Sequence, residues 1–480
     1  MQMIIDGKRA DASDRGVIRI LNPATQEFID IVPKATASDV YQAIDAAQAG
    51  KRIWANTPTH ERVRILSRCA DAIEEHLEDL AQSLSREMGK IIQEARGEIR
   101  VSAQTIRGYA EAAAHHYGKT LTDSQKGIEK DILFTRHEPL GVVACITPFN
   151  YPVLLVAHKM AAALATGNAV IVKPASDNPL TLIKLVALCL EQGIPGNVLQ
   201  IITGSGEVVG KILAENPKVN AISLTGSTEV GISLAETGAK TLKRVFLELG
   251  GNDPFIVLDD ADISKAIAAA VEGRLENAGQ TCCSSKRFLV HESIHDLFIK
   301  KLLEALSKIK HGSPQDDETE YGCLINGNAA QKVESQIQKT IEQGAKLICG
   351  GHAYNITYFE PTILDDVTLD MDIAKDMEVF GPVFPIITFK TDEDAVKIAN
   401  ASRYGLQAGV MTKSVDRAMH IAASLQCGAV VINGSGNYRH IEQPFGGYKM
   451  SGFGREGISG TLAEMTQEKT YVLKDVLIQP

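Results

Sequence analysis

The centre of the chain alternates between short apolar runs and amphipathic stretches with helical spacing. The apolar runs occupy residues 142–146, 169–172, 198–202, 221–224 and 245–249. A strand that is apolar on both faces is buried on both faces, and helical crossovers between such strands imply a parallel sheet. The pattern predicts an α/β, doubly wound domain of the Rossmann type, whose ligands should bind at the carboxyl ends of the strands.

A second alternating region follows Gly251, and we interpret it as a second α/β domain. Its apolar runs occupy residues 255–258, 287–290, 384–389, 408–411 and 429–432. Nearer the N-terminus, apolar side chains at spacings of three and four predict one helix over residues 60–88, which Gly89 ends. Residues 131–136 and 470–477 are strand-like and isolated, so each needs a pairing partner to be stable.

The composition fits a globular protein and argues against two classes of partner. The 480 residues carry a net charge of −10 and have an isoelectric point near 5.7, so we expect neither nucleic acid nor an anionic membrane as a partner. No apolar run approaches the length of about 18 residues that spans a bilayer, and the N-terminus lacks a signal-peptide pattern. None of the eight cysteines forms a C-x-x-C pair. We therefore expect a cytoplasmic protein without a disulfide framework or a metal site.

Three short motifs carry groups that can do chemistry. Residues 277–282 read Asn-Ala-Gly-Gln-Thr-Cys, residues 247–251 read Leu-Glu-Leu-Gly-Gly, and residues 147–150 read Thr-Pro-Phe-Asn. A thiol, a carboxylate and a side-chain amide are the side chains that an enzyme needs to oxidise an aldehyde through a thioester. Along nearly its whole length the chain resembles the NAD(P)-dependent aldehyde dehydrogenases. The resemblance is nearest to the group of lactaldehyde, non-phosphorylating glyceraldehyde-3-phosphate and phosphonoacetaldehyde dehydrogenases, with features of succinate-semialdehyde dehydrogenases.

The resemblance implies three catalytic roles. A lone cysteine is usually a core residue, but the motif selects Cys282 over the adjacent Cys283 as the nucleophile, and we expect a local field to lower the pKa of its thiol. Glu248 ends an apolar strand, where burial would raise its pKa and make it the base that activates the hydrolytic water. The branch of the family that transfers the acyl group to coenzyme A lacks this carboxylate. Asn150 either serves a turn or, with the Cys282 N–H, holds the oxyanion. Leu275 departs from the family, which usually has an aromatic residue there.

The cofactor implied by the resemblance is NAD or NADP. Gly226 and Ser227 precede a predicted helix and would face the phosphates; the glycine-rich stretch at residues 204–210 is a weaker candidate, because its spacing is one residue too long for the dinucleotide fingerprint. The uncharged Ser176, where the family often has a glutamate that favours NAD, predicts that NADP is tolerated. The implied cofactor residues are Thr147, Pro148, Lys173, Ser176, Gly206, Gly226, Ser227, Val230, Leu249, Glu378 and Phe380.

The substrate is the least determined feature. Succinate-semialdehyde dehydrogenases grip a carboxylate with arginines, but this chain has His158 and Glu276 at the matching positions. The implied substrate contacts are Arg107, Tyr151, Arg439 and Phe445. An arginine fork suits an anionic tail, although Arg107 fits a solvated helix face equally well. We expect a short polar or anionic aldehyde, resembling lactaldehyde or glyceraldehyde-3-phosphate, as the substrate. The alternatives are a succinate-semialdehyde dehydrogenase or an inactive structural or binding protein of the same fold.

The resemblance also implies a domain plan and an oligomer. Residues 1–118 and 139–250 would form the NAD(P)-binding domain, and residues 251–450 the catalytic domain. Residues 119–138 and 451–480 would form a small β oligomerisation element that bridges subunits. The expected assembly is a homodimer or a homotetramer.

Overall fold

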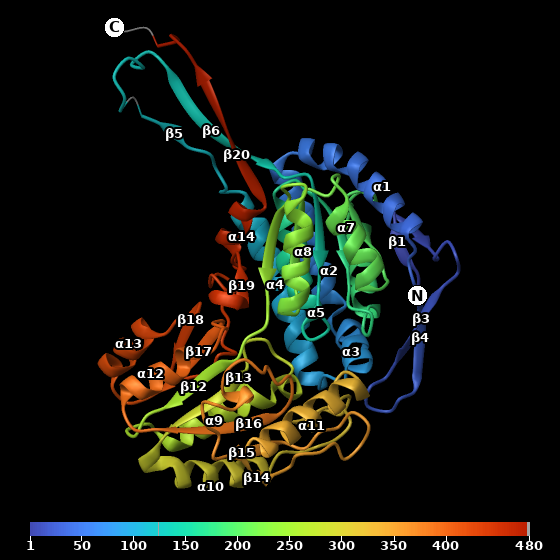
Figure 1. Ribbon diagram of the computed structural model, residues 1–480. Coiled ribbons are helices and arrows are strands. Elements are labelled where there is room, and N and C mark those ends of the chain that lie inside the picture. The colour runs from blue at the N-terminus through green and yellow to red at the C-terminus, as the bar shows by residue number, and fades with distance from the viewer. Residues whose placement is uncertain (123, 478–480) are drawn as a thin grey trace.

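Two sheet-based bodies and a projecting arm make up the protein (Figure 1). The computed structural model describes residues 1–122 and 124–477. In the described chain, no helix is long and apolar enough to cross a membrane.

The first sheet has the strand order β19-β11-β10-β7-β8-β9-β1-β2. Its five central strands are parallel, and β19, β1 and β2 add antiparallel edges. The strands are β1 (Met3–Ile5), β2 (Lys8–Ala10), β7 (Val142–Ile146), β8 (Ala169–Lys173), β9 (Leu199–Ile201), β10 (Ala221–Thr225), β11 (Arg244–Glu248) and β19 (Gly452–Phe453). The five apolar runs of the sequence are these central strands, which confirms the doubly wound fold.

Helices cover both faces of this sheet (Figure 1). They are α1 (Ala37–Asn56), α2 (Thr59–Glu75), α3 (Leu77–Met88), α4 (Ile92–Ala113), α5 (Pro152–Ala165), α6 (Leu180–Glu191), a π-helix (Gly206–Gly210) that runs into α7 (Lys211–Glu215), α8 (Thr228–Ala239) and α14 (Ile458–Glu464). The single helix predicted over residues 60–88 is wrong, because the chain breaks at His76, where φ is −103° and ψ is 19°. The apolar spacing continues through the break, so the pattern does not reveal it. Gly89 ends α3 in the left-handed region, as expected.

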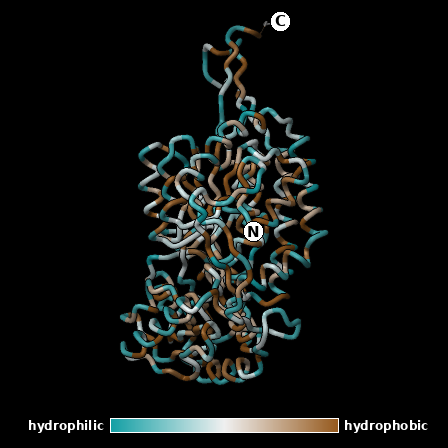
Figure 2. The backbone as a smooth tube through the Cα atoms, turned by 90° about the vertical axis from the view of Figure 1, so that its right-hand side faces the viewer, coloured by the Kyte–Doolittle hydropathy of each residue, from teal (hydrophilic) through white to brown (hydrophobic). Residues whose placement is uncertain are grey.

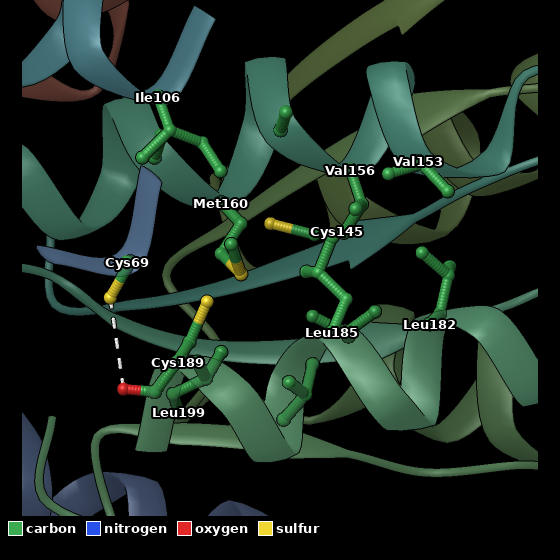
Figure 3. Packing of buried hydrophobic residues seen from close by; sticks show 14 of the residues in the cluster. Cys69, Ile106, Cys145, Val153, Val156, Met160, Leu182, Leu185, Cys189 and Leu199 are labelled. Atoms are coloured by element: carbon green, nitrogen blue, oxygen red, sulfur yellow. Dashed lines mark hydrogen bonds between the residues drawn. The ribbon is translucent and has the colours of Figure 1, made fainter. Parts of the chain in front are cut away.

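The core of this body lies between the sheet and helices α2, α4, α5 and α6. Figure 3 shows part of it, with the thiols of Cys69, Cys145 and Cys189 among aliphatic side chains. All eight cysteines are free thiols. Three of them therefore act here as small buried hydrophobes, as cysteines commonly do.

The second sheet has the strand order β14-β15-β16-β13-β12-β17-β18 and is parallel except for β14. Its strands are β12 (Asp253–Val257), β13 (Ser285–His291), β14 (Lys346–Cys349), β15 (Thr362–Asp365), β16 (Val383–Phe389), β17 (Gln407–Met411) and β18 (Ala429–Ile432). Its helices are α9 (Ile263–Leu275), α10 (His295–Leu306), α11 (Gly327–Glu342), α12 (Asp392–Asn400) and α13 (Val415–Ser424). The apolar pattern predicted five of these strands and missed β14 and β15.

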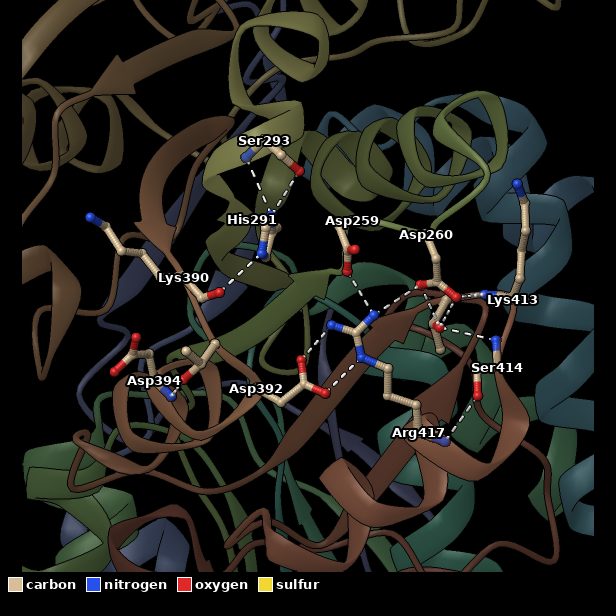
Figure 4. A network of polar contacts seen from close by, with 12 residues as sticks. Asp259, Asp260, His291, Ser293, Lys390, Asp392, Asp394, Lys413, Ser414 and Arg417 are labelled. Carbon is tan, nitrogen blue, oxygen red and sulfur yellow. Dashed lines mark hydrogen bonds and ion pairs between the residues drawn. The ribbon is translucent and has the colours of Figure 1, made fainter.

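An arginine on α13 fastens the rim of this second body. The Arg417 guanidinium forms a two-point ion pair with Asp392 at the start of α12 and also binds Asp259, which follows β12 (Figure 4). Arg417 thereby links the start of α13 to the start of α12 and the end of a central strand.

The arm consists of β5 (Thr120–Leu121), β6 (Ile132–Pro139) and β20 (Thr466–Leu473). The two isolated strands of the sequence pair with each other, in antiparallel register from Ile132–Leu473 to Pro139–Thr466. Figure 2 shows apolar as well as polar stretches along this arm, which stands clear of the body. A separate hairpin near the N-terminus consists of β3 (Val17–Leu21) and β4 (Phe28–Pro33). The domain boundaries expected from the sequence stay a prediction.

Candidate active site

The carboxyl ends of the parallel strands in the first sheet border a cavity of about 340 Å³. The register places Thr225 at the end of β10 beside Glu248 at the end of β11. From the second body, the turn before β13, helix α11 and the segment before β16 complete the lining. The cavity brings together nine residues named from the sequence: Pro148, Asn150, Gly226, Ser227, Glu248, Leu249, Cys282, Glu378 and Phe380.

The turn that carries Cys282 has a strained backbone. Asn277 and Ala278 have φ of 52° and 55°, and Gly279 has φ of 76°. Left-handed backbone is unfavourable for residues with a Cβ, so it persists only where the surroundings hold it. The Asn277 side chain donates to the carbonyl of Asn150 at 3.0 Å, which ties the nucleophile turn to the segment after β7. Residues 277–281 of this turn are all buried.

Cys282 lies half-buried on the cavity wall, whereas Cys283 is buried against Leu406 and Phe445. Cys282 also packs against this cluster, so the two adjacent thiols lie close together and differ in that Cys282 lines the cavity. The Cys283 thiol, burial and the Glu248 carboxylate raise the pKa of the Cys282 thiol, and the Lys286 charge opposes them. The expected net lowering of this pKa is absent from the structure, although one cation does act in that direction.

Glu248 is a buried carboxylate with free acceptor capacity. It is 4% exposed, and in the described part of the chain the Cys282 thiol is the one side chain that interacts with its carboxyl oxygens as a donor. Burial first, and then the nearby Glu456 carboxylate, raise its pKa to about 7. A carboxyl group that titrates near neutral pH beside a cavity can accept and return a proton.

Two hydrogen bonds that its backbone carbonyl accepts hold Asn150 in place. That oxygen accepts a hydrogen bond from the Lys90 ammonium at 2.8 Å as well as the one from Asn277. Lys90 is fully buried and also binds Glu98 at 2.5 Å. The segment that carries the Asn150 amide is therefore fixed by a buried ion pair from helix α4.

A buried network lies behind Glu248. The Glu456 carboxylate binds the ammonium of Lys159 and accepts a 2.7 Å hydrogen bond from Arg439. Although burial alone would raise the pKa of Glu456, Lys159 and Arg439 hold it below its ordinary value. A small space of about 20 Å³ between this network and Glu248 has room for about one water molecule.

The cofactor residues predicted from the sequence divide into two groups. Six of them line the cavity: Pro148, Gly226, Ser227, Leu249, Glu378 and Phe380. Thr147, Lys173, Ser176, Gly206 and Val230 are outside that lining; they lie at the carboxyl ends of β7, β8 and β9 or in the first turn of α8.

Features of the protein fit a bound dinucleotide. The buried hydroxyl of Thr147 has no hydrogen-bond partner, and a Cβ on Gly206 would meet no atom within 4 Å. The Ser227 hydroxyl accepts from the Val230 N–H at 3.4 Å and caps α8, whose N-terminus adjoins the cavity. A helix N-terminus binds phosphate well because its N–H groups are free and its dipole is positive there.

The residues expected to contact the substrate do not all lie at one site. The Tyr151 hydroxyl donates to the Glu276 carboxylate at 2.5 Å, and the Asn437 side chain donates to the same carboxylate at 2.6 Å. Glu276 borders a larger cleft of about 1250 Å³. Arg107, by contrast, binds Asp71 and Glu74 on the outside of α2 and lies outside the linings of both spaces.

The remaining substrate-side groups are buried near Glu456. The Arg439 guanidinium stacks over the Phe445 ring at 4.1 Å. Burial and the Arg439 charge lower the pKa of His158 to about 3, so this imidazole is neutral at pH 7.

Comparison with known proteins decides which family this site belongs to. Residues 10–471 match the model of the aldehyde dehydrogenase family. The chain belongs to the aldehyde dehydrogenase family. This confirms the expected enzyme class, an oxidoreductase that acts on aldehydes with NAD or NADP.

The aldehyde dehydrogenase has relatives with different named substrates. It is 39% identical to the succinate-semialdehyde dehydrogenase [NADP(+)] GabD of Escherichia coli, over 95% of this chain and 94% of the relative. It is 37% identical to a lactaldehyde dehydrogenase of Methanococcus maripaludis, over 99% and 100% of the two chains. The solved betaine aldehyde dehydrogenase of Staphylococcus aureus in complex with NAD+ superimposes with a TM-score of 0.96 at 33% identity, over 100% and 96% of the chains.

The sequence reasoning missed several buried charges of this aldehyde dehydrogenase. Lys90, Lys159, Lys286 and Glu456 are all buried beside the residues named from the motifs. A signal existed for Lys286, because Lys286 and Arg287 directly precede the apolar run Phe288–Val290 within strand β13. Charged residues are rarely buried unless they are paired, so a lysine in such a strand indicates a partner.

Proposed function

We propose that the protein oxidises a short hydroxylated aldehyde to the carboxylic acid through a thioester on Cys282, with NAD or NADP as oxidant. The observation that carries the proposal is the shared cavity of Cys282, Glu248 and Asn150, in which the buried Glu248 carboxylate lies by the Cys282 thiol and has a pKa of about 7. A nucleophile, a base and an amide donor on one cavity wall suit acyl chemistry.

The proposed chemistry begins at the thiol. Cys282 loses its proton to water and its thiolate attacks the aldehyde carbon, and the Asn150 side-chain N–H and the Cys282 backbone N–H hold the resulting oxyanion. The bound nicotinamide supplies the acceptor for the hydride that leaves this carbon. Glu248 then takes a proton from water, the water oxygen attacks the thioester carbonyl, and the acid departs as the Cys282 sulfur is released.

The cofactor would lie along the carboxyl ends of the first sheet. Gly226 and Ser227 would hold the phosphates, Glu378 the nicotinamide ribose, and Phe380 the nicotinamide ring. Lys173 and Ser176 would face the adenine ribose. Ser176 carries no charge, and its hydroxyl donates to the Gly204 carbonyl at 3.2 Å. Nothing at this position would repel a 2′-phosphate, so NADP is accepted.

The charges near the cleft favour a hydroxylated substrate over an anionic one. Arg107 and Arg439 are both neutralised by carboxylates of the protein itself. Glu276 adds a carboxylate beside Tyr151, and such a group accepts a hydrogen bond from a substrate hydroxyl but repels a second carboxylate. Arg439 and Phe445 would then shape the cleft rather than clamp an anion, and a role for Arg107 stays a prediction that its placement does not support.

The main competing function is that of a succinate-semialdehyde dehydrogenase, which the identity to the Escherichia coli relative favours. Two further functions have less support. An inactive protein of the same fold would have no need for the three chemical groups on the cavity, and acyl transfer to coenzyme A would have no need for Glu248.

We further propose a homodimer or homotetramer in the cytoplasm. Strand β18 lies at the edge of the second sheet, and the arm strand β20 exposes Val472 and Leu473. An apolar arm and an open strand edge are features that a second copy of the chain can cover. Eight free thiols fit a reducing compartment.

The direct test is the rate of NADH and NADPH formation with a panel of aldehydes. The panel holds lactaldehyde, glycolaldehyde, glyceraldehyde-3-phosphate, phosphonoacetaldehyde, succinate semialdehyde and propanal. We expect the highest kcat/KM with lactaldehyde or glycolaldehyde. A preference for succinate semialdehyde would contradict the role given to Glu276 and leave the mechanism intact, whereas no turnover at all would favour an inactive protein of the same fold.

A further inference from the structure

A buried lysine connects the nucleophile turn to the opposite side of the cavity. Lys286 lies in β13 with 1% of its side chain exposed. Its ammonium donates to the carbonyl of Thr281 at 2.9 Å and to the carbonyl of Cys282, and it lies 3.3 Å from the Glu378 carboxylate. An ammonium has three protons and no acceptor. Three acceptors from two different segments therefore surround it.

Glu378 is the partner of Lys286 that also faces the cavity. Its side chain is 21% exposed, and the carboxyl oxygen that pairs with Lys286 accepts a hydrogen bond from the Gly251 N–H at 3.1 Å. The same carboxylate lines the cavity with Cys282. The strength of the Lys286 charge at the thiol thus depends on how fully Glu378 neutralises it.

The other ionisable groups around the pair are buried. Asp253 faces Lys286, and burial raises its pKa to about 7. The positive charge of Arg274 attracts the Glu378 carboxylate through space, and that of Arg287 attracts the Asp253 carboxylate. Asp253, Arg287 and Arg274 belong to β12, β13 and α9, respectively. Hydrogen bonds to backbone groups hold each of these side chains in place.

On the nucleophile side, three groups act on the Cys282 thiol. The Cys283 thiol and the Glu248 carboxylate disfavour the thiolate, and Lys286 favours it. The thiolate is the attacking form, so a fixed cation beside it raises its concentration at neutral pH. A neutral donor would satisfy the two carbonyls equally well. The use of a charged group, whose burial is costly without pairing, indicates a role for the charge.

We propose that Lys286 is a positioning residue for the nucleophile: its ammonium fixes the turn through two carbonyls and supplies the positive charge that favours the Cys282 thiolate, to a degree set by Glu378. The inference rests on the proposed function, in which Cys282 is the nucleophile. It predicts opposite effects for two substitutions that break the same ion pair. Loss of the Lys286 charge disfavours the thiolate, and loss of the Glu378 charge favours it. If the ion pair were purely structural, both substitutions would change the ionisation of the Cys282 thiol in the same direction.

The test measures the rate at which iodoacetamide alkylates Cys282 as a function of pH, in the wild type, Lys286→Met and Glu378→Gln. Peptide mass spectrometry separates labelling of Cys282 from labelling of the other cysteines. We expect Lys286→Met to shift the pH profile of alkylation to higher pH by about one unit, so that alkylation near neutral pH is about tenfold slower. We expect Glu378→Gln to shift the same profile to lower pH.

Lys243→Met is the matched control. The Lys243 ammonium also donates to two backbone carbonyls, those of Leu213 and Asn216, but it lies at the other end of β11 from Glu248. Its substitution should leave the Cys282 profile at the wild-type position. Unfolding temperatures of all variants show whether the fold is retained. If Lys286→Met does not fold, the direction in which Glu378→Gln moves the Cys282 alkylation profile decides the proposal.

Two results would overturn the proposal: a wild-type alkylation profile in Lys286→Met, or an upward shift in Glu378→Gln. The experiment needs neither cofactor nor turnover. A wild-type protein that oxidises no aldehyde would therefore reject the proposed function, while the alkylation profiles would still decide the role of Lys286.

Discussion

The hydroxyl of Tyr151, in the segment after β7, donates a 2.5 Å hydrogen bond to the carboxylate of Glu276, which begins the nucleophile turn. Burial raises the pKa of Glu276, and the Tyr151 hydroxyl and the Lys90 charge oppose that rise. The pair places a carboxylate on the wall of the larger cleft, where the proposed function has it repel an anionic substrate tail.

Substitution of this carboxylate should therefore change substrate preference. We expect Glu276→Gln to raise kcat/KM for succinate semialdehyde relative to lactaldehyde by about tenfold, because a like charge near the tail is removed. Steady-state rates with both aldehydes give the ratio. Glu272→Gln is the control, since it removes an exposed charge from the same cleft. An unchanged ratio in Glu276→Gln would reject the role of Glu276 in selection.

Asn150 should act only on the oxidation step. We expect Asn150→Ala to lower kcat/KM by about 10²–10³, the usual cost of losing one oxyanion donor. Alkylation of Cys282 by iodoacetamide forms no oxyanion, so its rate should stay near that of the wild type. Equal losses in both assays would instead assign Asn150 to holding the turn.

The pKa of Glu248 predicts a pH-dependent stability effect. The folded pKa of about 7 exceeds the ordinary value of 4.5, so the contribution of Glu248 to stability is fully present below about pH 4.5 and is lost as pH rises through 7. Glu248→Gln removes this loss and should stabilise the protein at pH 8 by at most about 3–4 kcal/mol, from about 2.5 pH units at about 1.4 kcal/mol each. Urea unfolding at pH 8 and pH 4.5 measures the difference. Equal stabilisation at both pH values would contradict the assigned pKa.

Much of the site follows from the sequence, because parallel strands bring their carboxyl ends to one edge. Once residues 142–146 and 245–249 are recognised as buried strands, Asn150 and Glu248 must lie near each other. The string at residues 277–282 then supplies the thiol. The strand pattern together with the motifs of the resembling family named nine residues that line one cavity.

Contacts between distant segments could not be predicted in this way. Lys159 and Glu456 are 297 positions apart, and no spacing rule connects them. Arg107 reads as a substrate contact by position, but its pairing with Asp71 and Glu74 depends on how α2 packs against α4. The break at His76 was hidden for a different reason, since the apolar spacing is the same on both sides of it.

The cofactor preference has its own test. We expect Ser176→Glu to lower kcat/KM for NADP by about tenfold or more while NAD is affected less, because like charges that face each other cost several kcal/mol. The ratio of the two values in wild type and variant measures the effect. A ratio that does not move would place the 2′-phosphate elsewhere.

The central claim is that the aldehyde carbon is carried on Cys282 and released by Glu248. Its most direct test is the intact mass of Glu248→Gln after mixing with lactaldehyde and NADP, together with the amount of NADPH formed. We predict one equivalent of NADPH and an acyl adduct that peptide mapping locates on Cys282. Continuous NADPH formation without an adduct, or an adduct on Cys283, would contradict the account.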